Sequence, residues 1–175
     1  MAQSKAGMDN KGLATVIDDI IIEFYDGALN EYRKISRNTN DSAMTQKDVA
    51  DILQLTDDKF ISKIERSIQK MDDRTFTVFL LLTDNHPRYK LEPISTKTKQ
   101  KSFFLPSPDP SLIHKFRTNI VDLKATDLSC FLGLHSGMIR RYESEGNSRR
   151  SPSSYTWSLL LLITGQHPDY KLVKK

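Results

Sequence analysis

The chain has 175 residues, of which 38% are hydrophobic and 27% are charged, the balance of an ordinary globular protein. Its apolar runs fall short of the roughly 18 residues that a membrane-spanning helix needs, and the polar N-terminus up to Gly12 does not resemble a secretory signal. The single cysteine, Cys130, excludes an intramolecular disulfide framework and favours a reducing, cytoplasmic location. Its place on a predicted amphipathic helix predicts a buried thiol.

The net charge of +4 is distributed unevenly along the chain. Residues 1–93 carry 13 Lys/Arg and 16 Asp/Glu, a net charge of −3, whereas residues 94–175 carry 13 and 6, a net charge of +7. A polyanion is therefore expected to be drawn mainly to the second half. Basic surface can also serve solubility alone, so charge by itself does not decide for nucleic-acid binding.

The first half of the chain predicts a bundle of short helices after a flexible tail, 1–12. From residue 13 to about residue 37, apolar residues recur at spacings of three or four, which predicts helix, and Gly27 is placed to divide it. Thr45 and Asp48 then form a capping-box-like start. The helices that follow are predicted over residues 46–54, 58–67 and 73–82. These elements make up a first unit, 13–93.

Residues 94–111 are predicted to be a basic, proline-rich linker that contains Lys97, Lys99 and Lys101. The apolar trio 103–105 interrupts it and is expected to pack on a domain. A second unit, 112–175, follows. Its helices are predicted over residues 112–121, 125–132, 136–143 and 155–164, and Gly165 is placed to end the last one. Since no segment alternates convincingly as a strand, the predicted fold class is all-α.

The chain contains an internal repeat. Residues 83–91 read TDNHPRYKL and residues 164–172 read TGQHPDYKL, identical at six of nine positions, and each follows a run of leucines. We therefore interpret the protein as two copies of one unit. His86 and His167 stand at equivalent positions, where they are predicted to be structural groups that cap backbone carbonyls at a helix end.

Both copies also contain a short amphipathic helix, a tight turn and a second short helix. The segments are TQKDVADILQL before ISKIERS, and KATDLSCFLGL before IRRYESEG. They resemble the lambda-repressor-like, or Cro/Xre-type, helix-turn-helix DNA-binding proteins. The second copy matches more fully through Gly133, Ile139, Tyr142, Glu143 and Gly146. The first has Gln54 at the turn glycine and one extra residue before its third helix, while the second lacks the Thr-Gln start. The resemblance implies two tandem helix-turn-helix domains of four to five helices each.

The resemblance also implies roles for particular residues. The start of the second helix is expected to contact phosphate, and the exposed start of the third to read bases in the major groove. The implied phosphate contacts are Gln46, Lys47, Lys124 and Thr126, and the implied base readers are Lys59, Ser62, Lys63, His135, Ser136, Arg140 and Arg141. The basic loop after the last of these helices adds Arg149 and Arg150. Because Asp57 and Asp58 would repel phosphates, the second unit is expected to dominate binding.

Other kinds of chemistry are not indicated. The four histidines do not pair with ligands at metal-binding spacing, so no metal is expected. No glycine-rich phosphate loop or nucleophile elbow is present, and carboxylate pairs such as Asp18-Asp19 are typical of exposed helix starts. We therefore expect neither an enzyme nor a cofactor.

The sequence thus predicts a sequence-specific double-stranded DNA-binding protein that acts as a transcriptional regulator, by family analogy a repressor of a bacterial mobile element, associated with the nucleoid. A plasmid-maintenance or centromere-binding protein and an all-α protein-interaction adaptor remain open. The N-terminal helix is more apolar than one face requires, through Ile17, Ile20, Ile21, Ile22 and Phe24. Both an intramolecular core and a homodimer interface would explain it.

Overall fold

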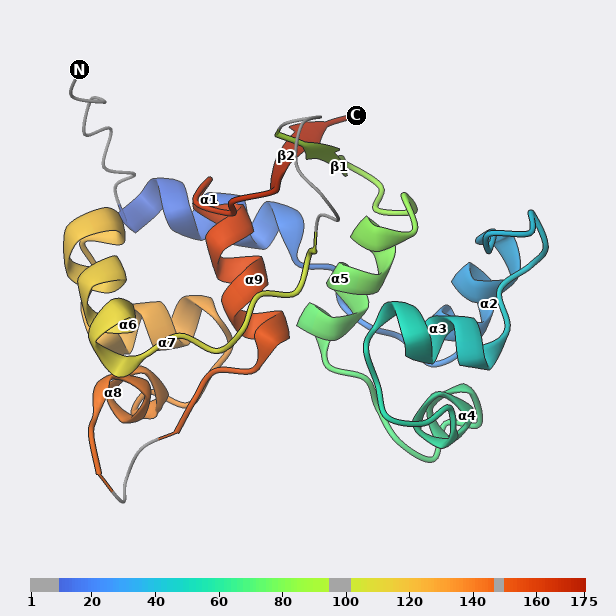
Figure 1. The fold of residues 1–175 in the computed structure, drawn as a ribbon, viewed down its shortest axis with the longest axis horizontal. Coiled ribbons are helices and arrows are strands. Elements are labelled where there is room, and N and C mark those ends of the chain that lie inside the picture. The colour runs from blue at the N-terminus through green and yellow to red at the C-terminus, as the bar shows by residue number, and fades with distance from the viewer. Residues whose placement is uncertain (1–9, 95–101, 147–149) are drawn as a thin grey trace. The chain divides into compact units, whose positions relative to one another are not determined.

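The computed structural model describes residues 10–94, 102–146 and 150–175, which are predominantly helical (Figure 1). The elements are α1 (Asn10–Ile20), α2 (Ala28–Ile35), α3 (Gln46–Ile52), α4 (Lys59–Glu65), α5 (Asp73–Leu82), β1 (Tyr89–Pro93), α6 (Pro110–Phe116), the π-helix η1 (Arg117–Val121), α7 (Ala125–Phe131), α8 (Met138–Glu143), α9 (Ser154–Ile163) and β2 (Tyr170–Lys174). None of the described helices is long and apolar enough to cross a membrane.

The chain forms two compact units, and each end of the chain belongs to the unit formed mainly by the opposite half of the sequence. The first unit consists of Ile20–Pro93 with Lys171–Lys175, and the second consists of the described parts of residues 1–19 and 94–170. Most of α1 therefore belongs to the second unit, and the last five residues belong to the first. These limits differ from the expected 13–93, 94–111 and 112–175. Of the expected linker, the part from residue 102 onward is described and belongs to the second unit, while Lys97, Lys99 and Lys101 lie outside the described residues.

One helix in each unit is buried on all sides. In α5 every residue from Phe76 to Leu81 is buried, and in α9 the same holds from Thr156 to Ile163. A helix that is apolar around its whole circumference is expected to be buried in a protein core. Among the remaining helices, α3 packs against α4 and α5, α2 packs against α4, and α8 packs against both α6 and α7 (Figure 1).

The helix starts follow their predicted chemistry. Thr45 and Asp48 form the expected capping box, in which the Thr45 hydroxyl accepts from the Asp48 amide and the Asp48 carboxylate accepts from the Thr45 amide. The bond from the Thr45 amide to the carboxylate, with further bonds from the Thr45 hydroxyl and the Asn38 side chain, lowers the pKa of the Asp48 carboxyl. Gly27 precedes α2 with a φ of 90°, so the expected division there is confirmed. Gly165, with a φ of 70°, follows α9 as predicted.

The helix expected over residues 13–37 is nevertheless interrupted. α1 begins at Asn10, inside the expected tail, and residues 21–25 are not helical. The reason is tertiary: the Ile22 amide donates to the Thr77 hydroxyl on α5 at 2.9 Å. The second unit repeats this contact, because the Leu105 amide donates to the Ser158 hydroxyl on α9 at 2.8 Å. The expectation that the apolar trio 103–105 packs on a domain is confirmed, since Phe103 is buried.

A two-stranded sheet, β1 with β2, was not expected. Each strand contains the repeated Tyr-Lys-Leu segment, and each is too short to show a convincing alternation. Each strand pairs with the copy from the other half of the chain, which a local sequence pattern does not reveal. The prediction of an all-α chain without strands is therefore wrong in this detail.

The apolar N-terminal helix has an intramolecular role. Ile17 and Ile20 are 5% and 1% exposed within the chain. Since these two side chains are already buried within one chain, their apolar character does not require a homodimer interface.

Candidate nucleic-acid interface

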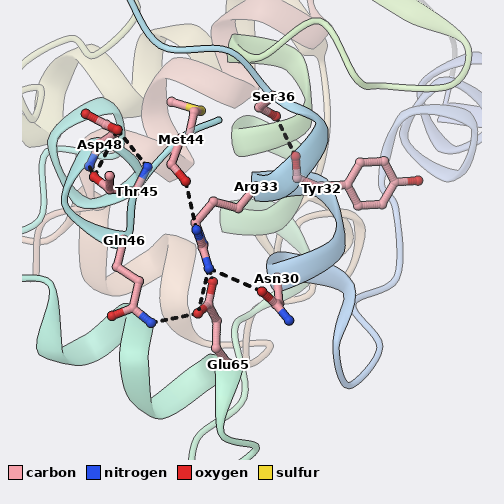
Figure 2. Close-up of polar contacts among 9 residues, drawn as sticks. All are labelled: Asn30, Tyr32, Arg33, Ser36, Met44, Thr45, Gln46, Asp48 and Glu65. Atoms are coloured by element: carbon pink, nitrogen blue, oxygen red, sulfur yellow. Dashed lines mark hydrogen bonds and ion pairs between the residues drawn. The ribbon is translucent and has the colours of Figure 1, made fainter. Parts of the chain in front are cut away.

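An arginine–glutamate pair anchors the two short helices of the first unit. Arg33 on α2 lies 2.5 Å from Glu65 at the end of α4, with side chains 18% and 8% exposed. The Arg33 guanidinium also donates to the Met44 carbonyl at 2.8 Å and to the Asn30 side-chain oxygen at 3.2 Å. The side-chain amide of Gln46, at the start of α3, donates to the Glu65 carboxylate at 2.7 Å (Figure 2). The pair therefore fixes α2, the loop before α3 and the start of α3 against α4.

The second unit contains the same anchor. Arg117 lies 2.5 Å from Glu143 at the end of α8 and donates to the Leu123 carbonyl, just before α7, at 2.8 Å. His114 stands 3.6 Å from Glu143, and Ala125 occupies the position that Gln46 has in the first unit. Both units thus hold a pair of short helices, α3–α4 and α7–α8, in the same way. We refer to these anchors as the framework pairs.

The outer side of α8 is basic. Arg140 and Arg141 are exposed, and neither has a carboxylate partner among the described residues. The Arg150 amide donates to the Arg141 carbonyl at 3.1 Å, which places this further arginine beside the end of α8. His135 and Ser136, before α8, are exposed as well. Two guanidinium groups are therefore available to an external anion or base edge. We refer to these five residues as the basic face.

The remaining predicted contacts of the second unit lie at α7. Lys124 precedes α7 and is exposed, whereas Thr126 is half-buried with its hydroxyl 3.4 Å from Asp127. Arg149 lies outside the described residues. Since α7 packs on α8, Lys124 belongs to the same substructure as the basic face.

The corresponding residues of the first unit are more engaged with the protein itself. Gln46 is bound to Glu65, as described above. Lys47 pairs with Asp51 at 2.9 Å, and this carboxylate raises the pKa of Lys47. Lys59 and Lys63 are exposed and Ser62 is half-buried.

Acidic and apolar groups share this side of the first unit. Asp57 and Asp58 are exposed before α4, and the Asp57 carboxylate accepts from the Lys59 amide at 2.7 Å. A shallow hollow of about 350 Å³ lies at the turn between α3 and α4, lined in part by Leu55 and Phe60. Acidic, basic and apolar groups therefore mix where the second unit has arginines.

The turns between the paired helices have the same backbone form. Gly133 has a φ of 60° and Gln54 a φ of 51°, in the left-handed region that favours glycine. The amide of the next residue then bonds back to the preceding helix in both units, Leu134 to Ser129 and Leu55 to Ala50, each at 2.8 Å. The first unit therefore adopts the turn in spite of its glutamine.

The two repeated histidines are buried and bind backbone carbonyls, as predicted, but not those of the helix that each one follows. His86 and His167 are 0% and 2% exposed. The His86 Nε2 lies 2.7 Å from the carbonyl of Ile20, the last residue of α1, and the His167 Nε2 lies 2.9 Å from the Phe103 carbonyl in the segment before α6. Neither carbonyl belongs to the helix that the histidine follows, α5 or α9. In each ring Nδ1 accepts two backbone amides, so Nε2 carries the proton and donates.

Two expectations concern reactive or metal-binding groups. Cys130 is exposed on α7, so the prediction of a buried thiol is wrong. Its neighbours Leu128 and Ser129 are buried, and the periodicity could not fix the orientation of a seven-residue helix. Within the described ranges, no three His, Cys, Asp or Glu side chains gather as metal ligands.

The framework pairs were missed by the sequence reasoning. The available signal was that both halves of the sequence contain the same two residue types in the same order. An arginine, Arg33 or Arg117, stands in the helix before the paired short helices, and a glutamate, Glu65 or Glu143, ends the second of them. Ion pairs on an inward helix face resemble surface charges until the fold is known.

Comparison with known proteins adds no family. A scan against protein-family models and searches of curated proteins and of solved structures found no match for this chain.

Proposed function

We propose that the protein is a sequence-specific double-stranded DNA-binding protein with two tandem helix-turn-helix units, acting as a transcriptional regulator and, by analogy, as a repressor at the nucleoid. The helix pairs α3–α4 and α7–α8 are the proposed motifs. Their support is the common framework, which fixes two short helices and leaves the outer side of the second exposed.

The observation that carries the proposal is the basic face of α8. Arg140 and Arg141 are exposed and have no carboxylate partner among the described residues. An arginine bonds the O6 and N7 atoms of guanine in bidentate fashion, and exposed guanidinium groups also bind phosphate. In this proposal, α8 reads bases, and Lys124 and Arg150 contact the DNA backbone.

Selection of bound sequences from a random DNA pool tests the proposal, followed by titration of the selected duplex at several salt concentrations. An enriched motif is expected, with affinity that falls steeply as salt rises. The variant Arg140→Ala/Arg141→Ala is expected to weaken binding at least tenfold, since one base-reading pair contributes about 1–3 kcal/mol. Absence of an enriched motif would refute the proposal.

A matched control removes the same charge elsewhere. Lys171 and Lys174 are exposed on β2, so Lys171→Ala/Lys174→Ala lowers the net charge equally. This variant is expected to keep the sequence preference. Equal losses in both variants would mean that charge alone, and not the α8 face, determines binding.

A second candidate function is favoured for the first unit. Asp57 and Asp58 are exposed, and Lys47 and Gln46 are occupied by Asp51 and Glu65. These features suit a protein-interaction adaptor better than a DNA reader. If Lys59→Ala/Lys63→Ala leaves the selected DNA motif and its affinity unchanged, the first unit does not read DNA, as the adaptor role requires; a loss of affinity or a changed motif would contradict that role.

A further inference from the structure

A groove of about 400 Å³ opens on the second unit along α6, η1 and α9. Phe116, Trp157 and Leu161 lie beneath it, and Ile120, 42% exposed, stands at its side. Lys115 stands among its lining residues. We propose that this groove binds a small amphiphilic carboxylate, with its apolar body on Trp157 and its carboxylate at Lys115.

The first unit closes the corresponding place with its own side chains. The third residue after the framework arginine is Ser36 there and Ile120 in the second unit. The residue before the buried histidine is Asn85 there and Gln166 in the second unit. The Asn85 amide donates to the Ser36 hydroxyl at 2.8 Å, which ties the end of α5 to the end of α2. The isoleucine in the second unit cannot accept such a bond, and the Gln166 amide lies 3.5 Å from the Thr164 carbonyl.

The aromatic packing is also more complete in the first unit than in the second. Phe76 on α5 contacts two rings edge-on, Phe24 at 5.3 Å and Tyr32 at 5.8 Å. Trp157, its counterpart on α9, contacts Phe116 at 5.3 Å, and among the described residues no further ring lies against it. Trp157 therefore lacks the second ring that its counterpart has, and as a lining residue of the groove it offers apolar surface to a bound group.

Charge indicates the ligand class. Two residues before each framework arginine stands Glu31 in the first unit and Lys115 in the second. Glu31 accepts from the Tyr25 hydroxyl at 2.8 Å, whereas Lys115 is exposed and has no carboxylate partner in the described ranges. An apolar groove with a few polar groups at its edge, here one cation, is typical of small-molecule sites.

The backbone supplies an independent observation. The chain from Arg117 to Val121 is a π-helix, whereas α2 ends at Ile35, two residues after its arginine. Single π-helical turns are frequent at functional sites. Here the turn carries Asn119 and Ile120, both of which line the groove.

The experiment uses Trp157, the one tryptophan of the chain, as the reporter. The full-length protein is titrated with decanoate below its micelle concentration while tryptophan emission is recorded, and decanol is the uncharged comparison. A saturable emission change is expected with decanoate, with about threefold to fivefold weaker binding of decanol, the effect of one exposed ionic contact. No saturable change with decanoate, or equal affinity for decanol, would overturn the proposal.

Variants locate the site. Lys115→Ala is expected to make decanoate bind like decanol. Ile120→Ser/Gln166→Asn, which restores the side chains of the first unit, is expected to weaken both ligands about tenfold through lost apolar contact. Ile35→Ser removes an exposed isoleucine of the first unit and is expected to change nothing. With circular dichroism confirming the fold of each variant, unchanged binding in both groove variants would refute the site. DNA binding plays no part in these measurements.

Discussion

Replacing Glu143 by alanine is expected to destabilise the second unit by about 3 kcal/mol. The substitution leaves Nε and Nη2 of Arg117 without the acceptors they have at 2.5 and 3.1 Å, while Nη1 keeps the Leu123 carbonyl. Removing one partner of a buried ion pair costs about 3–5 kcal/mol, because the remaining charge is left uncompensated. Side-chain exposures of 14% and 12% place this pair at the lower end of that range.

Urea unfolding followed by tryptophan emission measures this loss, because Trp157 lies in the same unit and its neighbour Phe116 precedes Arg117. With an m value of roughly 1–1.5 kcal/mol per M for a unit of this size, the midpoint is expected to fall by about 2–3 M. A fall of less than about 0.5 M, the effect of an exposed ion pair, would refute the reasoning.

The double variant Arg117→Met/Glu143→Leu is the control for charge burial. Since it leaves no buried charge, it is expected to cost less than half as much as Glu143→Ala. If the double variant is as unstable as the single one, the loss comes from packing and not from an unpaired guanidinium.

The remaining predictions concern the turns, the buried histidine and the cap. Gln54→Gly is expected to stabilise the protein by about 0.5 kcal/mol and Gly133→Ala to destabilise it by about 1–2 kcal/mol, both in thermal unfolding, because the turn requires a positive φ. His167→Ala is expected to cost about 2–4 kcal/mol in urea, since two amides and one carbonyl lose their partner. The lowered pKa of Asp48 means that its contribution is complete above the carboxyl pKa of the unfolded chain and is lost as the pH falls through the folded one. The stability difference between the protein and Asp48→Ala is therefore expected to be constant above about pH 5 and to shrink as the pH falls further, measured by urea unfolding at each pH.

The local elements could be predicted from the sequence because their causes are local. Spacings of three or four located α3, α4, α5, α7 and α9 to within a few residues, and the Thr45–Asp48 box marked a helix start correctly. Residues 21–25 show the limit of this reasoning: their pattern is helical, but Thr77 of α5 takes the amide of Ile22.

The tertiary features could not be predicted, because their causes are not local. The pairing of β1 with β2 and the assignment of α1 to the second unit depend on partners in the other half of the chain. For the candidate site, exposure of Arg140 and Arg141 agrees with their predicted place on an outer helix face. The occupation of Gln46 by Glu65 could not be read from the sequence, since it depends on the position of Arg33.

Comparison of the two repeats separates what the fold requires from what each unit adds. Both units contain the arginine–glutamate pair, the left-handed turn and the buried histidine, so these features belong to the fold. They differ at the outer side of the second short helix: the first unit has acidic residues beside α4, and the second unit has arginines on α8. They also differ along the helical segment that leads to the framework arginine: the first unit has a hydrogen-bonded bridge at α2, and the second unit has an open groove at α6. A difference between two copies of one framework is not needed for folding, because the other copy folds without it. The basic face and the groove are therefore the two places where a specific function of the second unit is most reasonably sought.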